Sequence, residues 1–239
     1  MSTDAILSGR GIGRVFGADE LAVRALRPTD LEVRPGEVLV IMGPSGSGKT
    51  TLLSILGLLL RPSEGEVLLQ GEPLDGSDEE RLTRLRRDNI GFVFQQINLL
   101  SGLTALENVA MPLLLKGVRS ERREALARGM LAEVGLVGKE LSKPRQLSGG
   151  QQQRVAIARA LVTGATVLLC DEPTASLDAE SSRTVLTLLR RSATQMGRAV
   201  VIVTHDERVL EYGDRLVEVT DGTTGPVRDL LKEEVEHAS

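Results

Sequence analysis

Cysteine and aromatic residues are scarce in this sequence of 239 residues, which has one Cys, no Trp, one Tyr and three Phe. The lone Cys170 cannot form an internal disulfide bond. It ends the apolar run Val167-Leu-Leu-Cys, where a thiol is typically a small buried hydrophobe in a protein of a reducing compartment. We therefore expect the fold to be held by noncovalent packing.

The sequence also lacks a long hydrophobic run. Its longest, Leu52–Leu60, is interrupted by Ser54 and Gly57 and falls far short of the ~20 residues that a membrane span needs. The N-terminus has no sustained apolar stretch, so we expect no signal peptide. We expect a soluble chain that reaches a membrane only through a partner.

A strong excess of either charge is missing as well. The formal net charge is −4, so the chain has no overall electrostatic reason to bind nucleic acid or an anionic membrane. Arginines gather at Arg81, Arg84, Arg86 and Arg87, but acidic residues lie beside them. We interpret this stretch as the solvated face of a helix.

The sequence is rich in alternating strand-like and helix-like segments. Runs of Val, Ile and Leu predict strands at Val38–Met42, Glu66–Gln70, Ile90–Phe94, Val167–Cys170, Ala199–Thr204 and Leu216–Val219. Their continuous hydrophobicity is typical of parallel strands buried on both faces. Helical patterns lie at Lys49–Leu60, Thr104–Lys116, Ser120–Val134, Gly149–Thr163 and Ala179–Ala193. The alternation predicts an α/β fold.

One interval breaks this alternation. From about Asn98 to Ala165 the sequence has helical patterns but no convincing strand. We interpret the interval as a helical subdomain inserted between two strands of the core. The charged end of the chain, Leu230 to Ser239, is expected to be a frayed helix or a tail.

A glycine-rich loop gives the most specific chemical signal. Residues 43–50 match the pattern G-x-x-x-x-G-K-S/T between an apolar strand and a helical segment. The backbone N–H groups of such a loop and the positive end of the helix dipole bind phosphate oxygens. Lys49 is expected on the β- and γ-phosphates, and the Thr50 hydroxyl on Mg²⁺. The expected nucleotide contacts are Gly43, Pro44, Ser45, Gly46, Ser47, Gly48, Lys49, Thr50 and Thr51.

Two adjacent acids, Asp171 and Glu172, end the apolar strand that begins at Val167. A carboxylate at the tip of a buried strand near a phosphate loop can hold Mg²⁺, which suits Asp171. Glu172 can orient or deprotonate the attacking water. The alternative interpretation is a plain Asp-Glu-Pro turn at a strand end.

The stretch Leu147-Ser-Gly-Gly-Gln151 can be read from its residues first. Ser148 and Gln151 form a capping-box pattern that opens an amphipathic helix. Gly149 and Gly150 leave the N–H groups of that helix uncovered, so they can serve as a second anion site. A well-capped helix start without further function is the alternative.

This stretch, continued as QQRVAIARAL, resembles the signature motif of ATP-binding-cassette (ABC) ATPases. The resemblance implies a P-loop NTPase cassette of α/β class with an N-terminal antiparallel β region and an inserted helical subdomain. It also implies that two copies dimerise head to tail, so that each ATP lies between one phosphate loop and residues Ser148, Gly149, Gly150 and Gln151 of the other copy.

Further residues match the motifs of the family in its order. Gln95 matches the glutamine that senses Mg²⁺, and Asp178 lies in the loop that crosses the dimer interface. His205 matches the switch histidine on the γ-phosphate, although a lone His at a strand end is more often structural. Phe16 stands where the family places an aromatic to stack on adenine, and core packing is its alternative role.

The resemblance covers about Leu7 to Val219. We expect one ATPase domain at 5–225, with its core at 5–95 and 166–225, a helical subdomain at about 96–165 and a C-terminal tail at 226–239. The stretch from Ile90 to Gly117 is similar to lipoprotein-releasing, macrolide-efflux and peptide-resistance ATPases. In that subgroup the region after Gln95 forms the groove for a short helix of the membrane partner. Ala175-Ser176, usually Gly-Asn there, and the segment after Asp221 depart from the pattern.

The resemblance therefore implies an ATPase that uses ATP and Mg²⁺, forms a homodimer and drives an integral membrane permease from the cytoplasmic face of the inner membrane, with no nucleic-acid partner. Two alternatives stay open. One is a mechanical regulator that signals across a membrane without moving a solute. The other is a soluble cassette that acts on DNA or ribosomes, although such proteins usually carry tandem cassettes, zinc-binding cysteines or coiled coils. A non-hydrolysing ATP sensor is disfavoured by the intact Glu172, Gln95 and His205.

Overall fold

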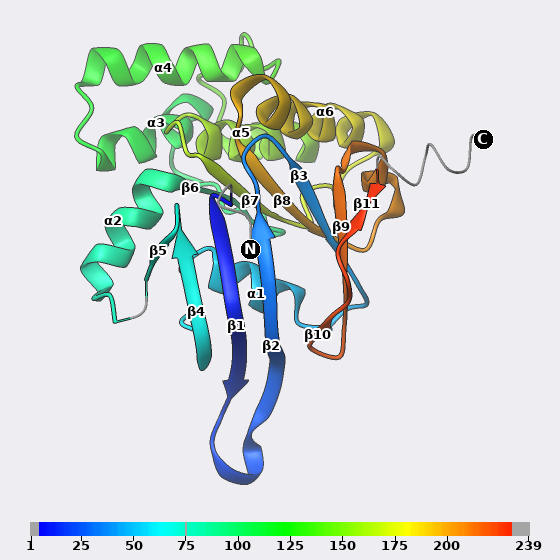
Figure 1. The fold of residues 1–239 in the computed structure, drawn as a ribbon. Helices are drawn as coiled ribbons and strands as arrows, with labels where there is room; N and C mark the ends of the chain where they lie inside the picture. Colours follow the sequence, from blue (N-terminus) through cyan, green and yellow to red (C-terminus); the bar gives the residue numbers. More distant parts are fainter. Residues whose placement is uncertain (1–4, 75, 231–239) are drawn as a thin grey trace.

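The computed structural model describes residues 5–74 and 76–230, which form two β-sheets and a group of helices (Figure 1). The larger sheet has the order β10 (Thr223–Thr224), β9 (Arg215–Thr220), β3 (Val38–Met42), β8 (Ala199–Thr204), β7 (Val167–Asp171) and β6 (Ile90–Val93). From β9 to β6 all neighbours are parallel. The predicted parallel α/β core is confirmed.

The second sheet is antiparallel, as expected for the N-terminal region. Its order is β2 (Val23–Val33), β1 (Leu7–Phe16), β4 (Glu64–Leu69) and β5 (Glu72–Pro73). The predicted strand Glu66–Gln70 was assigned to the parallel sheet, and this was wrong because it is β4 and pairs antiparallel with β1. A short apolar run has the same pattern in both sheet types, so only its partner strand distinguishes them.

Helix α1 (Lys49–Leu56) is packed between the two sheets. One core cluster joins Leu52 and Leu56 of α1 to Leu39 of β3 and to Leu7 and Leu26 of the antiparallel sheet. The α1 helix is shorter than the predicted Lys49–Leu60, because the chain leaves the helical conformation after Gly57 and Leu58 has a φ of 56°.

The opposite face of the parallel sheet is covered by α5 (Gly149–Leu161) and α6 (Ala179–Met196). Val38 and Val40 of β3 point to this side and pack with Ile157 of α5 and Leu189 of α6. Residues of β3 thus alternate between two apolar layers, as the period of a strand requires.

Between β6 and β7 the structure has helices and no strand. They are α3 (Ala105–Leu115), α4 (Ser120–Glu133), the short 3-10 helix η2 (Pro144–Gln146) and α5. Helices α3, α4 and α5 share a core cluster that includes Val109, Leu131 and Val155. The exact division of the chain at 95/96 and 165/166 stays a prediction.

Four short elements complete the description: η1 (Asp19–Leu21), α2 (Glu79–Asn89), η3 (Glu207–Tyr212) and β11 (Arg228–Asp229). The α2 helix carries the clustered arginines. Strand β11 pairs with β9, so the sheet extends into the predicted tail. The rest of that tail, 231–239, lies outside the described residues. None of the described helices has the length and hydrophobicity of a membrane span.

A buried ion pair ties β9 to the turn before β3. Arg215 Nη1 donates to both carboxylate oxygens of Glu37 at 2.9 and 3.1 Å and to the Glu32 carbonyl at 3.2 Å. The Arg215 and Glu37 side chains are only 11% and 9% exposed. Removal of the arginine would leave a buried carboxylate without its cation.

We expect Arg215→Ala to lower the free energy of unfolding by about 3–5 kcal/mol, because an uncompensated buried charge is costly. Urea unfolding followed by circular dichroism measures it. Arg84→Ala is the matched control, since Arg84 pairs with Glu80 on the exposed face of α2, and it should change stability by no more than about 0.5 kcal/mol. Equal losses in the two variants would contradict this role of the buried pair.

Candidate nucleotide-binding site

The phosphate loop runs from Gly43 to Gly48, between β3 and α1, and its path requires glycine. Gly48 has a φ of 104°, and a Cβ there would lie 2.4 Å from the Ala25 carbonyl oxygen. A Cβ on Gly43 would lie 2.0 Å from the Val219 carbonyl oxygen. No other residue type fits so close to neighbouring backbone.

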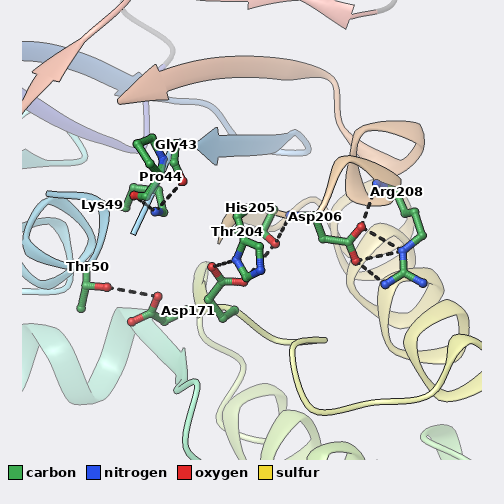
Figure 2. Close-up of polar contacts among 10 residues, drawn as sticks. Gly43, Pro44, Lys49, Thr50, Asp171, Thr204, His205, Asp206 and Arg208 are labelled. Carbon is green, nitrogen blue, oxygen red and sulfur yellow. Dashed lines mark hydrogen bonds and ion pairs between the residues drawn. The ribbon is translucent and has the colours of Figure 1, made fainter. Parts of the chain in front are cut away.

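Two buried polar side chains at this loop, those of Lys49 and Ser47, form no ion pair with a described residue. Lys49 is only 7% exposed, and its Nζ donates to the carbonyl oxygens of Gly43 and Pro44, each at 2.8 Å (Figure 2). Ser47 is buried, and its Oγ has no hydrogen-bond partner among the described residues. A buried ammonium, an orphaned hydroxyl and the N-terminus of α1 converge here, which is the chemistry of a phosphate site.

Next to the loop, the ends of α1 and β7 bring two hard oxygen ligands together. Thr50 Oγ1 donates to Asp171 Oδ1 at 3.4 Å (Figure 2). Burial raises the pKa of Asp171, and the Thr50 hydrogen bond opposes this rise. Among the described residues no group of three or more His, Cys, Asp or Glu could hold a metal by itself. One carboxylate and one hydroxyl fit Mg²⁺, because substrate phosphates and water usually supply the other ligands of this ion.

Glu172 and His205, each predicted for the nucleotide site in a separate role, are in contact. His205 Nδ1 lies 2.7 Å from Glu172 Oε1, and the Thr204 hydroxyl donates to Glu172 Oε2 at 3.1 Å. The Glu172 backbone has a φ of 48°, a left-handed conformation that is uncommon for this residue type. Its N–H donates to the Val203 carbonyl at 2.8 Å. The acid is therefore held against β8 at the start of the turn that follows β7.

The predicted capping box opens α5. The Gln151 N–H donates to Ser148 Oγ at 3.3 Å, and the Ser148 N–H donates to Gln151 Oε1 at 3.0 Å. Gly149 is exposed, whereas Gly150 is buried against α6, where a Cβ would lie 2.4 Å from Ser181 Oγ. No hydrogen bond or ion pair between described residues joins this helix end to the phosphate loop. One chain does not bring the two predicted anion sites into contact.

Asp178 caps α6. Its Oδ1 accepts from the Ser181 N–H and its Oδ2 from the Ser181 hydroxyl, both at 2.9 Å. These hydrogen bonds lower the pKa of Asp178. Both carboxylate oxygens are thus used within the chain. Ser181 was missed by sequence reasoning, although its place three residues after Asp178 is a helix-capping spacing.

Gln95 and Phe16 lie at the ends of β6 and β1. Gln95 is exposed and makes no side-chain hydrogen bond to another described residue. Phe16 is 41% exposed, so the alternative of core packing is wrong for it. The Arg14 guanidinium lies 4.8 Å from the centroid of the Phe16 ring, in a cation–π contact.

The class of protein follows from this site, where a phosphate loop, two adjacent acids and a histidine lie at one edge of the parallel sheet. It is a protein that binds a nucleoside triphosphate on a phosphate loop. The sequence pattern of one family, described as ABC transporter, matches residues 26–175. The chain belongs to this family, and it is an ATP-binding cassette with ATPase activity.

The chain is similar to proteins of two lengths. It is 47% identical over 223 residues to the macrolide export ATP-binding/permease protein MacB of Marinobacter nauticus, which covers 93% of this chain and 34% of that protein. It is 46% identical over 211 residues to an uncharacterized ABC transporter ATP-binding protein of Thermotoga maritima, covering 88% of this chain and 90% of the relative. The chain thus spans about a third of the length of the MacB relative.

A solved structure has the same fold. It is the dimeric post-hydrolysis state of the ATP-binding cassette MJ0796 bound to ADP and Pi, with a TM-score of 0.88 and 41% identity. The match covers 94% of this chain and 98% of that one. The predicted ABC cassette fold is confirmed.

We expect Lys49→Ala to weaken ATP binding roughly 10- to 150-fold, since one hydrogen bond to a charged group contributes about 1.5–3 kcal/mol. Isothermal titration calorimetry without turnover measures the dissociation constant. Lys139→Ala is the control, because it removes the same charge from an exposed position and should leave binding unchanged. Equal affinities of Lys49→Ala and the control would refute the loop as the phosphate site.

Proposed function

We propose that two copies of this chain close around two ATP molecules and that the resulting motion drives a membrane permease. Each ATP would lie between Lys49 of one copy and the α5 end at Ser148 of the other. The observation that carries this proposal is the Glu172–His205 pair at the sheet edge where the phosphate loop lies. Among the described residues, no hydrogen bond or ion pair joins this loop to the α5 end of its own chain. The dimeric form of MJ0796, bound to ADP and Pi, supports a dimer of this cassette.

The residues divide the work of hydrolysis. Lys49 and the loop N–H groups hold the phosphates, and His205 contacts the γ-phosphate once the site is closed. Glu172 orients or deprotonates the attacking water. Thr50, Asp171 and Gln95 would hold Mg²⁺, which neutralises charge on the phosphate oxygens.

Three further residues are proposed to contact the nucleotide or to act across the dimer. Phe16 would stack on adenine through the ring face that is not covered by Arg14. Asp178 would act across the dimer through its loop, because its carboxylate caps α6. Gly149 would let the partner's γ-phosphate approach the α5 N–H groups.

We expect Glu172→Gln to keep wild-type ATP affinity and to lose turnover, because the amide cannot accept the proton of the attacking water. The ATP-bound dimer should then accumulate, which size-exclusion chromatography with light scattering detects. Hydrolysis above about a tenth of the wild-type rate would remove Glu172 from its role, since a general base contributes typically 10²–10⁴-fold.

A variant at Ser148, where α5 begins, is the control for a nucleotide site shared by two copies. Adding Ser148→Arg to Glu172→Gln should abolish the ATP-dependent dimer while the monomer still binds ATP normally. Dimers that form as before would contradict the proposed place of Ser148 at the partner's nucleotide.

A groove among the helices supports the proposal of a membrane partner. A cavity of about 540 Å³ lies between α2, β6, α3 and α5. Its apolar lining includes the stacked pair Phe92 and Phe94, whose centroids are 4.3 Å apart, and Leu115, which is 68% exposed. Arginines also line it, at positions 86, 87 and 159. This surface fits a short amphipathic helix with acidic residues at its polar edge.

The name of the MacB relatives supports a permease as the source of that helix. We propose that the cassette sits on the cytoplasmic face of the membrane through this contact, and that the transport is of the efflux or extraction type. ATP can drive it because the γ-phosphate is held from both sides only in the closed dimer, which gives the two states different affinities.

We expect Glu172→Gln, purified from its native membranes with ATP in mild detergent, to bring a polytopic membrane protein in stoichiometric amount. Adding Leu115→Glu should abolish this, because it places a charge in the apolar groove. Adding Leu141→Glu is the control, since Leu141 is 75% exposed and does not line the groove. Retention of the membrane protein by the Leu115 variant would move the contact elsewhere.

A further inference from the structure

Thr204 is the last residue of β8 and lies directly beside the proposed catalytic acid. Its side chain is fully buried, and its hydroxyl donates to Glu172 Oε2 at 3.1 Å (Figure 2). A buried hydroxyl at a strand end must find hydrogen-bond partners, and this one uses the carboxylate as an acceptor. From the sequence, Thr204 was predicted only as the last residue of the strand Ala199–Thr204.

The direction of this hydrogen bond is set by a second contact. The Asp206 N–H donates to Thr204 Oγ1 at 3.1 Å, so the hydroxyl oxygen is already an acceptor and its proton is available for Glu172. Arg208 holds Asp206 in turn, since its Nη2 donates to Asp206 Oδ2 at 2.7 Å and its backbone N–H to Oδ1 at 3.0 Å (Figure 2). The donor is therefore preorganised before any substrate arrives.

The two oxygens of Glu172 have partners of different mobility. Thr204 is paired in the interior of the sheet, opposite Met42 of β3, and cannot leave without breaking the ladder. The His205 side chain is 64% exposed and follows the strand, so its ring can turn away from Oε1. Contact of His205 with a γ-phosphate would release Oε1, whereas the hydrogen bond to Oε2 would remain.

We propose that Thr204 is a positioning residue that fixes Oε2 of Glu172, which leaves Oε1 as the oxygen that acts on the attacking water. This inference rests on the proposed role of Glu172. It concerns the chemical step alone, because the Thr204 hydroxyl makes its hydrogen bonds to Glu172 and Asp206 and none to a described residue of the phosphate loop. Its loss should thus lower kcat and leave ATP affinity unchanged.

The test compares Thr204→Val, which keeps the shape and removes the hydroxyl, with Thr204→Ser, which keeps the hydroxyl. We expect Thr204→Val to reduce kcat at saturating ATP about 10- to 150-fold, the value of one hydrogen bond to a charged group. Thr204→Ser should restore most of the rate. Both should bind ATP with the wild-type dissociation constant, which a purely structural defect would not preserve.

Thr166→Val is the matched control. The Thr166 hydroxyl donates to the Asn89 carbonyl at 3.3 Å, at the far end of the neighbouring strand β7. The control loses a hydroxyl and its hydrogen bond without touching Glu172, and it should keep the wild-type kcat. If Thr204→Val does not fold, Thr204→Ala replaces it, because it lacks the hydroxyl and adds no bulk.

A double variant separates this proposal from the role of Glu172. If Thr204 acts through the carboxylate, adding Thr204→Val to Glu172→Gln should slow single-turnover hydrolysis no further. Full activity of Thr204→Val beside an inactive Glu172→Gln would overturn the positioning role and leave the proposed function standing. An active Glu172→Gln would instead overturn the role of Glu172 itself.

Discussion

Parallel pairing of β3, β8 and β7 is the constraint on which the site depends. The register places Met42 beside Thr204 and Asp171 beside Val203, so these strands end at nearly the same level. The residues that follow them, in the phosphate loop, at Glu172 and at His205, therefore meet at one sheet edge although they are far apart in sequence. A ligand site at the carboxyl ends of the strands is the general rule for open α/β sheets.

The site carries groups that the folded chain leaves poorly compensated. Lys49 is buried on backbone carbonyls, Ser47 has an orphaned hydroxyl among the described residues, and burial raises the pKa of Asp171. Each would be stabilised by a phosphate or a divalent cation. These buried polar groups therefore lower the stability of the free chain, and a bound substrate would compensate them. The apolar clusters on both sides of the sheet hold these groups in place.

Much of the site could be predicted from motifs of short spacing in the sequence. Features that depend on contacts between distant residues could not. The phosphate loop, the acids after Val167 and the capping box at Ser148 are set by short spacings with a direct physical meaning. Which sheet β4 joins is decided by its pairing with β1. The β1 strand was not predicted, because many of its residues are small or polar. The capping partner of Asp178 was missed although its spacing of three residues is a local signal. The donor on Glu172 was missed because Thr204 is 32 positions away in the sequence, and only the fold brings the two together.

In the proposed dimer, the separation of the two predicted anion sites in one chain is the reason why the cassette would work as a pair. The helix end at Ser148 is held by its closed capping box and by the packing of Gly150 on Ser181 of α6. No hydrogen bond or ion pair between described residues joins it to the phosphate loop of its own chain, so a second copy would supply it in the proposed dimer. The groove at Leu115 is lined in part by α3 and α5, and α5 begins at that same helix end. In the proposed dimer, movement of one copy toward the nucleotide of the other would therefore carry the groove with it, which would couple ATP binding mechanically to the proposed membrane partner.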